Sequence, residues 1–227
     1  MRDPSLHTAG FYHIYNRGVD KRRIFIDERD YQDFYESLYL YSDANYTNPH
    51  GDFMTKASEL SGYEVFADDR DPLVRIISFY LSGNHFHFFL EQLHDNGISN
   101  FMHKLQRTYS YKFNRRYGRS GTLFESKFKS KSVDNEAYFT HIPRYIHLNA
   151  LDLQLPEWRT GDIKDWGLAQ QILDNDQWSS HSVYMRKSQQ LPIVDETFVH
   201  ALFQSSPEYI TFLKEFAGAK SGFEFDF

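Results

Sequence analysis

Two apolar stretches that meet at a tight turn constrain the fold more than any other feature of the chain. Residues 73–83 read LVRIISFYLSG and residues 85–92 read HFHFFLEQ, and turn-forming residues separate them. β-Branched and aromatic residues flanking a short turn predict a β-hairpin. Because alternate residues of a strand point to the same side of a sheet, His85 and His87 are expected on one side and Phe86 on the other.

The segments around this hairpin predict alternating strands and helices. Residues 10–18 alternate aromatic with polar residues, as a strand does, and Asp27 is a suitable cap for the helix that follows. A helix begins near Ile98 and is ended by GRSG, a strand covers residues 122–133, and a helix capped by Asp134 or Asn135 runs to about Asn149. The order β-α-β-β-α-β-α predicts an α+β fold, a ferredoxin-like antiparallel sheet with helices packed on one face.

The other residues are assigned to an insertion and a tail. Residues 43–72 are rich in turn formers and acids, with a short helical pattern at 56–60, and predict an insertion or a long loop. Residues 151–227 combine loop-like sequence with short helical patterns, and predict a C-terminal helical tail that packs on the core. We therefore expect a core domain of residues 1–150 that carries this tail.

Composition excludes several classes of function. The 227 residues include no Cys, which excludes disulfides, thiolate catalysis and Cys-type zinc sites and suits a reducing compartment. No apolar run approaches the roughly 18 residues that span a bilayer. The polar start does not resemble a signal peptide. We expect a soluble cytoplasmic protein with no membrane partner.

Positive charge is concentrated in one segment although the chain is acidic. The net charge is -6, yet residues 104–131 contain nine Lys and Arg against one acid, Glu125. This segment carries +8 and the remainder of the chain -14. Such asymmetry is typical of a surface that binds a polyanion. A solvated basic helix face is the alternative.

Two groups of residues suggest chemistry. His85 and His87 are positioned to bind one divalent cation, although paired histidines are more often hydrogen bonded within a protein or exposed. Tyr145 and Asn149 stand one helical turn apart, so a phenol and a carboxamide oxygen share one face. A positioned tyrosine is a covalent nucleophile, and a carboxamide oxygen suits Mg²⁺ or Mn²⁺. Core packing is the alternative for a single helical tyrosine.

These residues lie within motifs that resemble a known family. The chain resembles IS200-type single-tyrosine HUH transposases, and most closely the REP-associated tyrosine transposase branch. The resemblance covers nearly the whole chain outside residues 43–72. The motifs that carry it are, in order, YHIYNRGVDKRRIF, GNHFHFFLEQ, FNRRYGRSGTLFESKFKS, RYIHLNA, WSSHSVY and LFQSSPEYITFLKEF.

The resemblance implies the HUH transposase fold and a role for each candidate residue. His85, His87 and Asn149 would ligate Mg²⁺ or Mn²⁺. Tyr145 would attack a phosphodiester of single-stranded DNA, giving a 5′-phosphotyrosine and a free 3′-OH, and rejoining would reverse this step. The expected partner is single-stranded DNA folded into a hairpin of a palindromic repeat. The candidates for phosphate contacts are Arg17, Lys104, Arg107, Arg115, Arg116, Arg119, Lys127 and Lys129.

Several alternatives stay open at the level of sequence. Tyr138 lies seven residues before Tyr145 and is the second candidate nucleophile. Pro143 removes a helix hydrogen bond close to Tyr145 and can re-aim the phenol. A hairpin-binding protein of the same fold without strand transfer, and an RNA-binding module, are the competing functions. The protein acts as a monomer or a homodimer, and the acidic insertion can compete with DNA for the basic segment.

Overall fold

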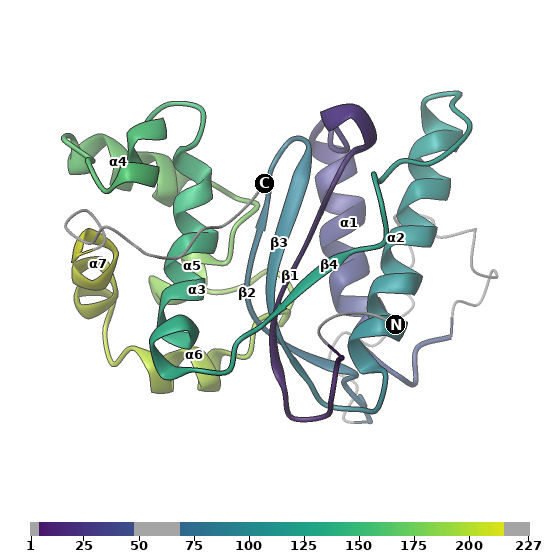
Figure 1. Cartoon of the computed structure of the whole chain (residues 1–227), viewed down its shortest axis with the longest axis horizontal. Helices are drawn as coiled ribbons and strands as arrows, with labels where there is room; N and C mark the ends of the chain where they lie inside the picture. The colour runs from purple at the N-terminus through teal and green to yellow at the C-terminus, as the bar shows by residue number, and fades with distance from the viewer. Residues whose placement is uncertain (1–4, 48–68, 216–227) are drawn as a thin grey trace.

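A four-stranded antiparallel sheet lies at the centre of the molecule (Figure 1). The structure is a computed structural model that describes residues 5–47 and 69–215. The elements of its core are β1 (Phe11–Arg17), α1 (Glu28–Tyr41), β2 (Val74–Leu81), β3 (His85–Gln92), α2 (Gly97–Arg116) and β4 (Lys129–Ser132), with a 3-10 turn, η1 (Val19–Lys21), after β1. The spatial order is β2-β3-β1-β4, which is the ferredoxin-like arrangement, so the predicted fold class is confirmed.

The predicted hairpin is formed by β2 and β3. Across its turn the Ser82 amide donates to the His85 carbonyl at 2.8 Å. β1 pairs with the other edge of β3, with Tyr15 opposite His87 and Arg17 opposite His85. The strand that carries both histidines is therefore held by hydrogen bonds on both sides, which makes it a rigid support.

Residues of β3 alternate between the two faces of the sheet as the period of two predicts. The Phe86 ring lies 5.5 Å from the Phe34 ring of α1. The next odd-numbered aromatic after the histidine pair, Phe89, lies 5.1 Å from the Phe139 ring of α3 (Glu136–Leu148) on the opposite face. Both histidines therefore point to the side of the sheet that α3 covers.

The ends of α1 and α2 follow the local signals in the sequence. The Asp27 side chain accepts a hydrogen bond from the Asp30 amide at 3.2 Å and the Asp30 carboxylate accepts from the Asp27 amide, which is a capping box. After α2 the chain passes through Gly118 and Gly121, whose φ angles are 61° and 82°. Glycine adopts this left-handed conformation without the strain that a Cβ introduces, so GRSG ends the helix as predicted.

Helices cover both faces of the sheet, whereas the sequence pattern predicted one covered face. α1 and α2 lie on one side, and α3 with the tail helices lies on the other (Figure 1). The one-face prediction is wrong because the second face is also aromatic, with Phe89 fully buried there. An apolar face left in water would lose the free energy of burial, so a second layer of helices is required.

β4 is shorter than the strand predicted over residues 122–133. It contains only Lys129–Ser132, and residues before it form bends. Phe124 makes one isolated bridge with Gly18, and the Glu125 amide donates to the Arg17 carbonyl at 3.0 Å. This hydrogen bond belongs to the same bridge, so the segment meets the end of β1 without continuous pairing. Lys127 lies outside the strand as a result.

The tail is helical and adds to the edge of the sheet. Its elements are η3 (Asn149–Leu151), η4 (Pro156–Thr160), α4 (Trp166–Asn175), α5 (His181–Tyr184), α6 (Glu196–Leu202) and α7 (Ser206–Lys214). The Leu81 amide donates to the Trp178 carbonyl at 2.9 Å, and the Ser180 amide donates to the Phe79 carbonyl at 3.0 Å. The tail therefore covers the free edge of β2, which would otherwise expose unpaired backbone groups. The division at residue 150 stays a prediction.

The two ends of the predicted insertion lie side by side. The Ala44 amide donates to the Asp71 carbonyl at 2.8 Å, and the Leu73 amide donates to the Ser42 carbonyl at 2.7 Å. Residues 48–68, with the helical pattern expected at 56–60, lie outside the described residues. Among the described residues no helix combines the length and apolarity needed to cross a bilayer.

Candidate active site

His85 and His87 lie together on the sheet face that α3 covers. Their ring centroids are 5.1 Å apart and their planes are nearly perpendicular, at 87°. His87 is fully buried and His85, at the start of β3, is partly exposed. The Asn84 carboxamide oxygen lies 2.7 Å from Nδ1 of His85, which places the proton on Nδ1 and makes Nε2 the basic nitrogen. The pair can thus present imidazole nitrogens on one face of the sheet, at the end where β3 begins.

The structure brings Tyr145 to this histidine pair. Asn135 caps α3 by accepting from the Tyr138 amide at 2.7 Å, and the helix runs without interruption through Pro143. The Tyr145 ring centroid lies 5.6 Å from that of His87, with the planes at 88°. Tyr138 stands two turns earlier on the same helix, so the geometry supports Tyr145 as the nucleophile. The assignment itself stays a prediction.

Asn149 lies at the end of α3, one turn after Tyr145. Its Nδ2 donates to the Tyr145 carbonyl at 2.6 Å, and its Oδ1 accepts from Nη2 of Arg159 at 3.1 Å. The side chain is almost completely buried. A carboxamide oxygen has two lone pairs, so one remains for a cation when Arg159 uses the other.

Burial sets the protonation states of these groups. Burial lowers the pKa of His85 to about 4 and holds the pKa of His87 well below its usual range, so both rings are neutral near pH 7. Burial also raises the pKa of the Tyr145 phenol, while the Arg159 guanidinium and the Asn149 amide act in the opposite direction. Burial raises the pKa of Tyr138 to about 12. Neutral imidazoles are the form that binds metal ions.

Two further residues reach the site that the sequence did not indicate. Nε2 of His13, on β1, lies 2.9 Å from Nδ1 of His87, and the two rings are stacked with centroids 5.2 Å apart. Burial, with a smaller effect of Lys131, lowers the pKa of His13 to about 3, so one proton is shared between two neutral rings. Arg159, on η4, contacts Asn149 from the tail. The sequence did not indicate His13 because only the pairing of β1 with β3 brings its ring beside His87.

The donor set fits a divalent cation through its chemistry. His85, His87 and Asn149 offer two imidazole nitrogens and an amide oxygen, which are neutral ligands that leave positions for phosphate and water. Within residues 5–47 and 69–215 no group of three or more His, Cys, Asp or Glu is placed to bind a metal. The expected metal site would therefore need Asn149 as its third protein ligand, which stays a prediction.

The predicted phosphate-contacting residues divide between the two faces of the sheet. Arg17 and Lys129 lie on the site face and share the Glu125 carboxylate, at 2.5 Å and 3.1 Å. The basic residues of α2 lie on the opposite face, since α2 packs on the side of the sheet away from α3. Those on α2 or directly after it are Lys104, Arg107, Arg115, Arg116 and Arg119.

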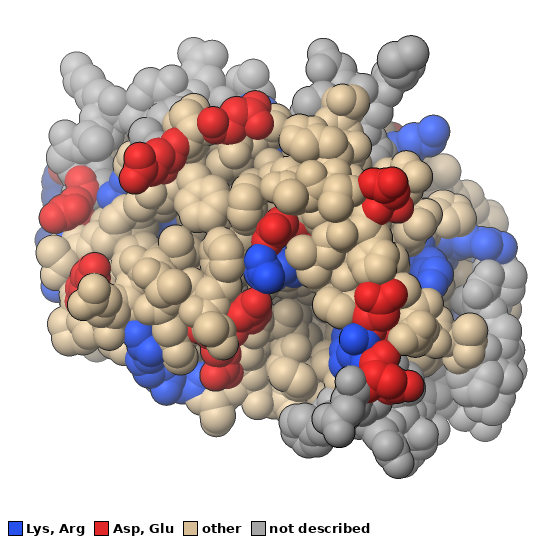
Figure 2. Space-filling model, turned by 90° about the horizontal axis from the view of Figure 1, so that it is seen from below, with Lys and Arg blue, Asp and Glu red and all other residues tan. Residues whose placement is uncertain are grey.

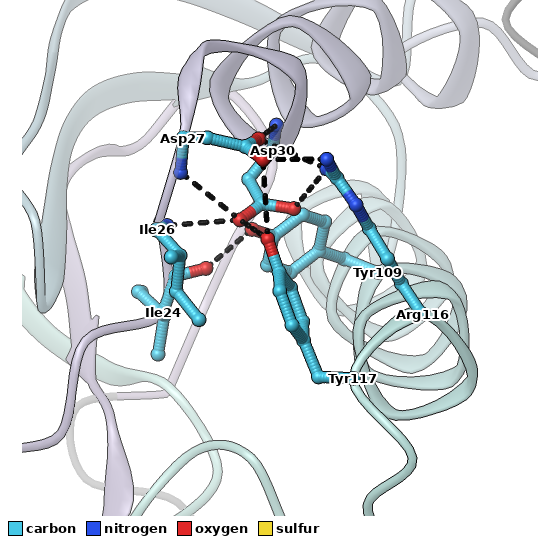
Figure 3. Close-up of polar contacts among 7 residues, drawn as sticks. All are labelled: Ile24, Ile26, Asp27, Asp30, Tyr109, Arg116 and Tyr117. Atoms are coloured by element: carbon cyan, nitrogen blue, oxygen red, sulfur yellow. Dashed lines mark hydrogen bonds and ion pairs between the residues drawn. The ribbon is translucent and has the colours of Figure 1, made fainter.

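Arg116 has a structural role that its sequence position did not reveal. Its guanidinium bonds to Asp27 at 2.5 Å and to Asp30 at 2.8 Å, and the Tyr117 hydroxyl also donates to Asp30 at 2.8 Å (Figure 3). Asp30 is buried, and Ile26 donates its amide to the same carboxylate. These contacts join the start of α1 to the end of α2 and neutralise the charge that a phosphate would need.

The other basic side chains differ in how accessible they are. Arg107, Arg115 and Lys127 are exposed, whereas Lys104 is half-buried and Arg119 donates to Asn114 at 3.0 Å. On the face seen from below, acidic side chains are scattered among uncharged ones and basic side chains form no continuous patch (Figure 2). This face therefore offers no continuous basic surface to a polyanion. Contact of these residues with DNA stays a prediction.

An open groove of about 590 Å³ is lined in part by Ser82 and Gly83, in the turn that precedes His85. Tyr31 and Trp178 line it with stacked rings, 5.1 Å apart and 13° from parallel. Tyr80 also lines it, and its ring lies 6.4 Å from the His85 ring. Burial raises the pKa of Asp176, another lining residue, to about 6. The groove is thus rich in aromatic and polar groups, and it lies beside the turn that precedes His85.

Comparison with known proteins identifies the family of the central segment. Residues 67–149 match the family model described as "Transposase IS200 like". A solved structure of a REP-associated tyrosine transposase bound to a REP hairpin aligns with a TM-score of 0.47 at 11% identity, covering 79% of this chain and 82% of that one. Comparison with curated proteins gives no match. The segment that carries the histidine pair, Tyr145 and Asn149 therefore matches the IS200-like transposase family, which is the resemblance that the motifs indicated.

Proposed function

We propose that this protein cleaves and rejoins single-stranded DNA beside hairpins, with Tyr145 as the nucleophile and a divalent cation as cofactor. The observation that carries the proposal is the packing of the Tyr145 ring edge-on against His87, 5.6 Å away, on a face that also holds His85. Nucleophile and predicted ligands thus share one side of a rigid sheet. The family match of residues 67–149 supports transposase chemistry in general.

The reaction follows from what the chain's own groups can do. The Tyr145 oxygen attacks the phosphorus and the bond from phosphorus to the 3′ oxygen breaks. The phenol loses its proton and the departing 3′ oxygen gains one. The 5′ phosphate stays on Tyr145 as an ester, whose bond energy is conserved, so rejoining to another 3′-OH requires no nucleotide cofactor.

His85, His87 and Asn149 would hold Mg²⁺ or Mn²⁺. When bound, the cation supplies electrophilic activation of the phosphate. The need for it is physical, because burial raises the pKa of the phenol and makes phenolate scarce near pH 7. Hydrogen bonds from neighbouring residues orient the predicted ligands: His13 fixes the tautomer of His87 through their 2.9 Å contact.

The groove beside His85 supports an unpaired strand as the ligand. Tyr31 is stacked between contacts with Phe25 and Trp178, and the half-buried Trp178 ring would offer a surface on which an unpaired base stacks, which duplex DNA does not permit. We propose a hairpin with a single-stranded flank, as in the REP-associated branch, and a cytoplasmic location. Arg17, Lys127 and Lys129, with the exposed residues of α2, would contact phosphates and contribute a salt-sensitive part of the affinity.

A hairpin-binding protein without strand transfer is the second candidate. The observation that favours it is the burial of Tyr145, which is only 2% exposed, because a nucleophile must reach phosphorus. The formation of a covalent DNA complex, or its absence, separates the two functions. An RNA-binding function is separated by comparing ribose and deoxyribose forms of one oligonucleotide.

The test is a search for a covalent complex. Single-stranded oligonucleotides from the sequence flanking the gene are incubated with the protein and Mn²⁺, then separated on a denaturing gel. We expect an adduct that EDTA prevents and that Tyr145→Phe abolishes while hairpin binding is retained.

Tyr138→Phe is the matched control, since it removes the same hydroxyl two turns earlier on the same helix and should retain the adduct. An adduct that persists in Tyr145→Phe and disappears in Tyr138→Phe would show the nucleophile assignment to be wrong. Hairpin binding with no adduct under any metal condition would favour the binding protein. Stronger binding of the ribose form would favour the RNA-binding module.

A further inference from the structure

Arg159 enters the candidate site from the tail. It belongs to η4, in a stretch whose sequence resembles a loop, and its Nη2 donates to Oδ1 of Asn149 at 3.1 Å. The proposed chemistry assigns it no role. A guanidinium beside the predicted nucleophile and a predicted ligand calls for an explanation, since a cation there raises the cost of binding a second cation.

The guanidinium is held in a defined orientation. Asp152 accepts from its Nε at 3.0 Å and from its Nη2 at 2.7 Å, which is a bidentate pair. The guanidinium carbon lies 4.7 Å from the centroid of the Trp158 ring, and the Trp158 indole donates to Asp152 at 2.7 Å. Trp158 is buried, and its ring is 5.9 Å from the Tyr145 ring. The tail thus builds a support that fixes Arg159 next to Tyr145.

The pair with Asp152 leaves donors for a ligand. A guanidinium has five N–H groups, of which Asp152 takes two and Asn149 one, through Nε and Nη2. Arg159 also hydrogen bonds with the Tyr145 side chain, so at least one N–H of Nη1 remains for a ligand. Its charge is felt across the site, since it acts to lower the pKa of His85, His87 and the Tyr145 phenol. An anion placed between these groups would therefore meet positive potential and a directed donor.

We propose that Arg159 is a catalytic residue that binds a non-bridging oxygen of the scissile phosphodiester through Nη1. This inference rests on the proposed function. Attack by Tyr145 concentrates negative charge on the non-bridging oxygens, and a preorganised donor stabilises that charge more than the ground state. The tail is then part of the catalytic site, because residues 67–149 alone do not include Arg159. The alternative is a purely structural role, in which Arg159 only ties η4 to Asn149.

Equilibrium binding without metal separates these roles. The scissile phosphate is first located from the adduct of the wild-type protein. Binding is then measured in EDTA for Tyr145→Phe and for Tyr145→Phe with Arg159→Gln, each with the natural oligonucleotide and with one bearing a neutral methylphosphonate at that position.

We expect the neutral linkage to weaken binding to Tyr145→Phe by about tenfold and to the double variant by less than about twofold. Because each comparison is a ratio within one protein, a loss of folded protein cancels. Equal weakening in both proteins would overturn the proposal.

Rates give a second measurement. Arg159→Gln should slow single-turnover adduct formation about 10²-fold to 10³-fold, and Arg159→Lys should recover part of the loss. Lys164→Gln is the matched control, since Lys164 is an exposed tail cation and should leave the rate unchanged. Absence of an adduct in the wild type contradicts the proposed function, whereas an adduct formed equally fast by Arg159→Gln contradicts only the role of Arg159.

Discussion

The hydroxyl of Tyr209 joins the tail to the helix that carries Tyr145. It lies 2.9 Å from Nδ1 of His147 on α3 and 2.9 Å from Nδ1 of His181 on α5. Nε2 of His147 lies 2.7 Å from the Ser180 hydroxyl. All four side chains are buried. A hydroxyl has one proton, so it donates to one imidazole and accepts from the other.

Tyr209→Phe removes this hydroxyl and keeps the ring in its aromatic surroundings. The ring centroid lies 5.0 Å from that of Tyr184 and 5.4 Å from that of Phe203, contacts that phenylalanine preserves. The loss is therefore polar: two buried imidazole nitrogens each lose a partner, at about 1–2 kcal/mol apiece. We expect the free energy of unfolding to fall by about 2–4 kcal/mol, a large part of the roughly 5–15 kcal/mol typical of a domain.

Urea unfolding followed by circular dichroism measures this change, and thermal unfolding should show a melting temperature lower by roughly 5–15 °C. Tyr184→Phe is the matched control, because its buried hydroxyl donates to the Ile77 carbonyl at 3.2 Å and bridges no pair of imidazoles. It should cost about half as much. If Tyr209→Phe is no more destabilising than Tyr184→Phe, the bridging hydroxyl contributes nothing beyond one ordinary hydrogen bond and the reasoning fails.

Three further predictions concern pH, a helix contact and salt. Burial lowers the folded-state pKa of His181 to about 4. The contribution of neutral His181 to stability is therefore complete above the unfolded-state pKa near 6.5, and it is lost as pH falls towards 4 by about 1.4 kcal/mol per pH unit. His181→Asn should reduce the pH dependence of urea unfolding between pH 6.5 and 4.5. Arg116→Gln should lower the free energy of unfolding by about 1–3 kcal/mol because buried Asp30 loses its charged partner, and an unchanged urea midpoint would contradict this. Replacing Lys127 and Lys129 by Gln should reduce the slope of log affinity against log salt for single-stranded DNA by about 1.4, and an unaltered slope would exclude both from phosphate contact.

Local patterns predicted much of the core. Period-two alternation placed His85 and His87 on one face, and helical spacing placed Tyr145 and Asn149 one turn apart. The capping sequence at Asp27 correctly indicated where α1 begins. These predictions succeeded because strand alternation, helix periodicity and caps depend on residues a few positions apart.

Other features depended on contacts between distant residues. Arg116 reaches Asp27 across 89 positions of sequence, and the ring of His13 meets His87 across 74. Neither pairing has a local signal, so Arg116 resembled a free basic residue and His13 an ordinary strand residue. The predicted strand over residues 122–133 was too long because pairing with β1, not propensity, decides where β4 begins.

The sequence by itself determined the α+β order of elements, the histidine pair, the tyrosine with its asparagine, and the resemblance to IS200-like transposases. Only the tertiary structure decided that both sheet faces are covered, that α2 lies on the face away from the site, and that Arg159 of the tail meets Asn149. The physical reason is range. Backbone geometry acts over a few residues, whereas packing and charge pairing act through space, between segments whose separation along the chain carries no information about their distance.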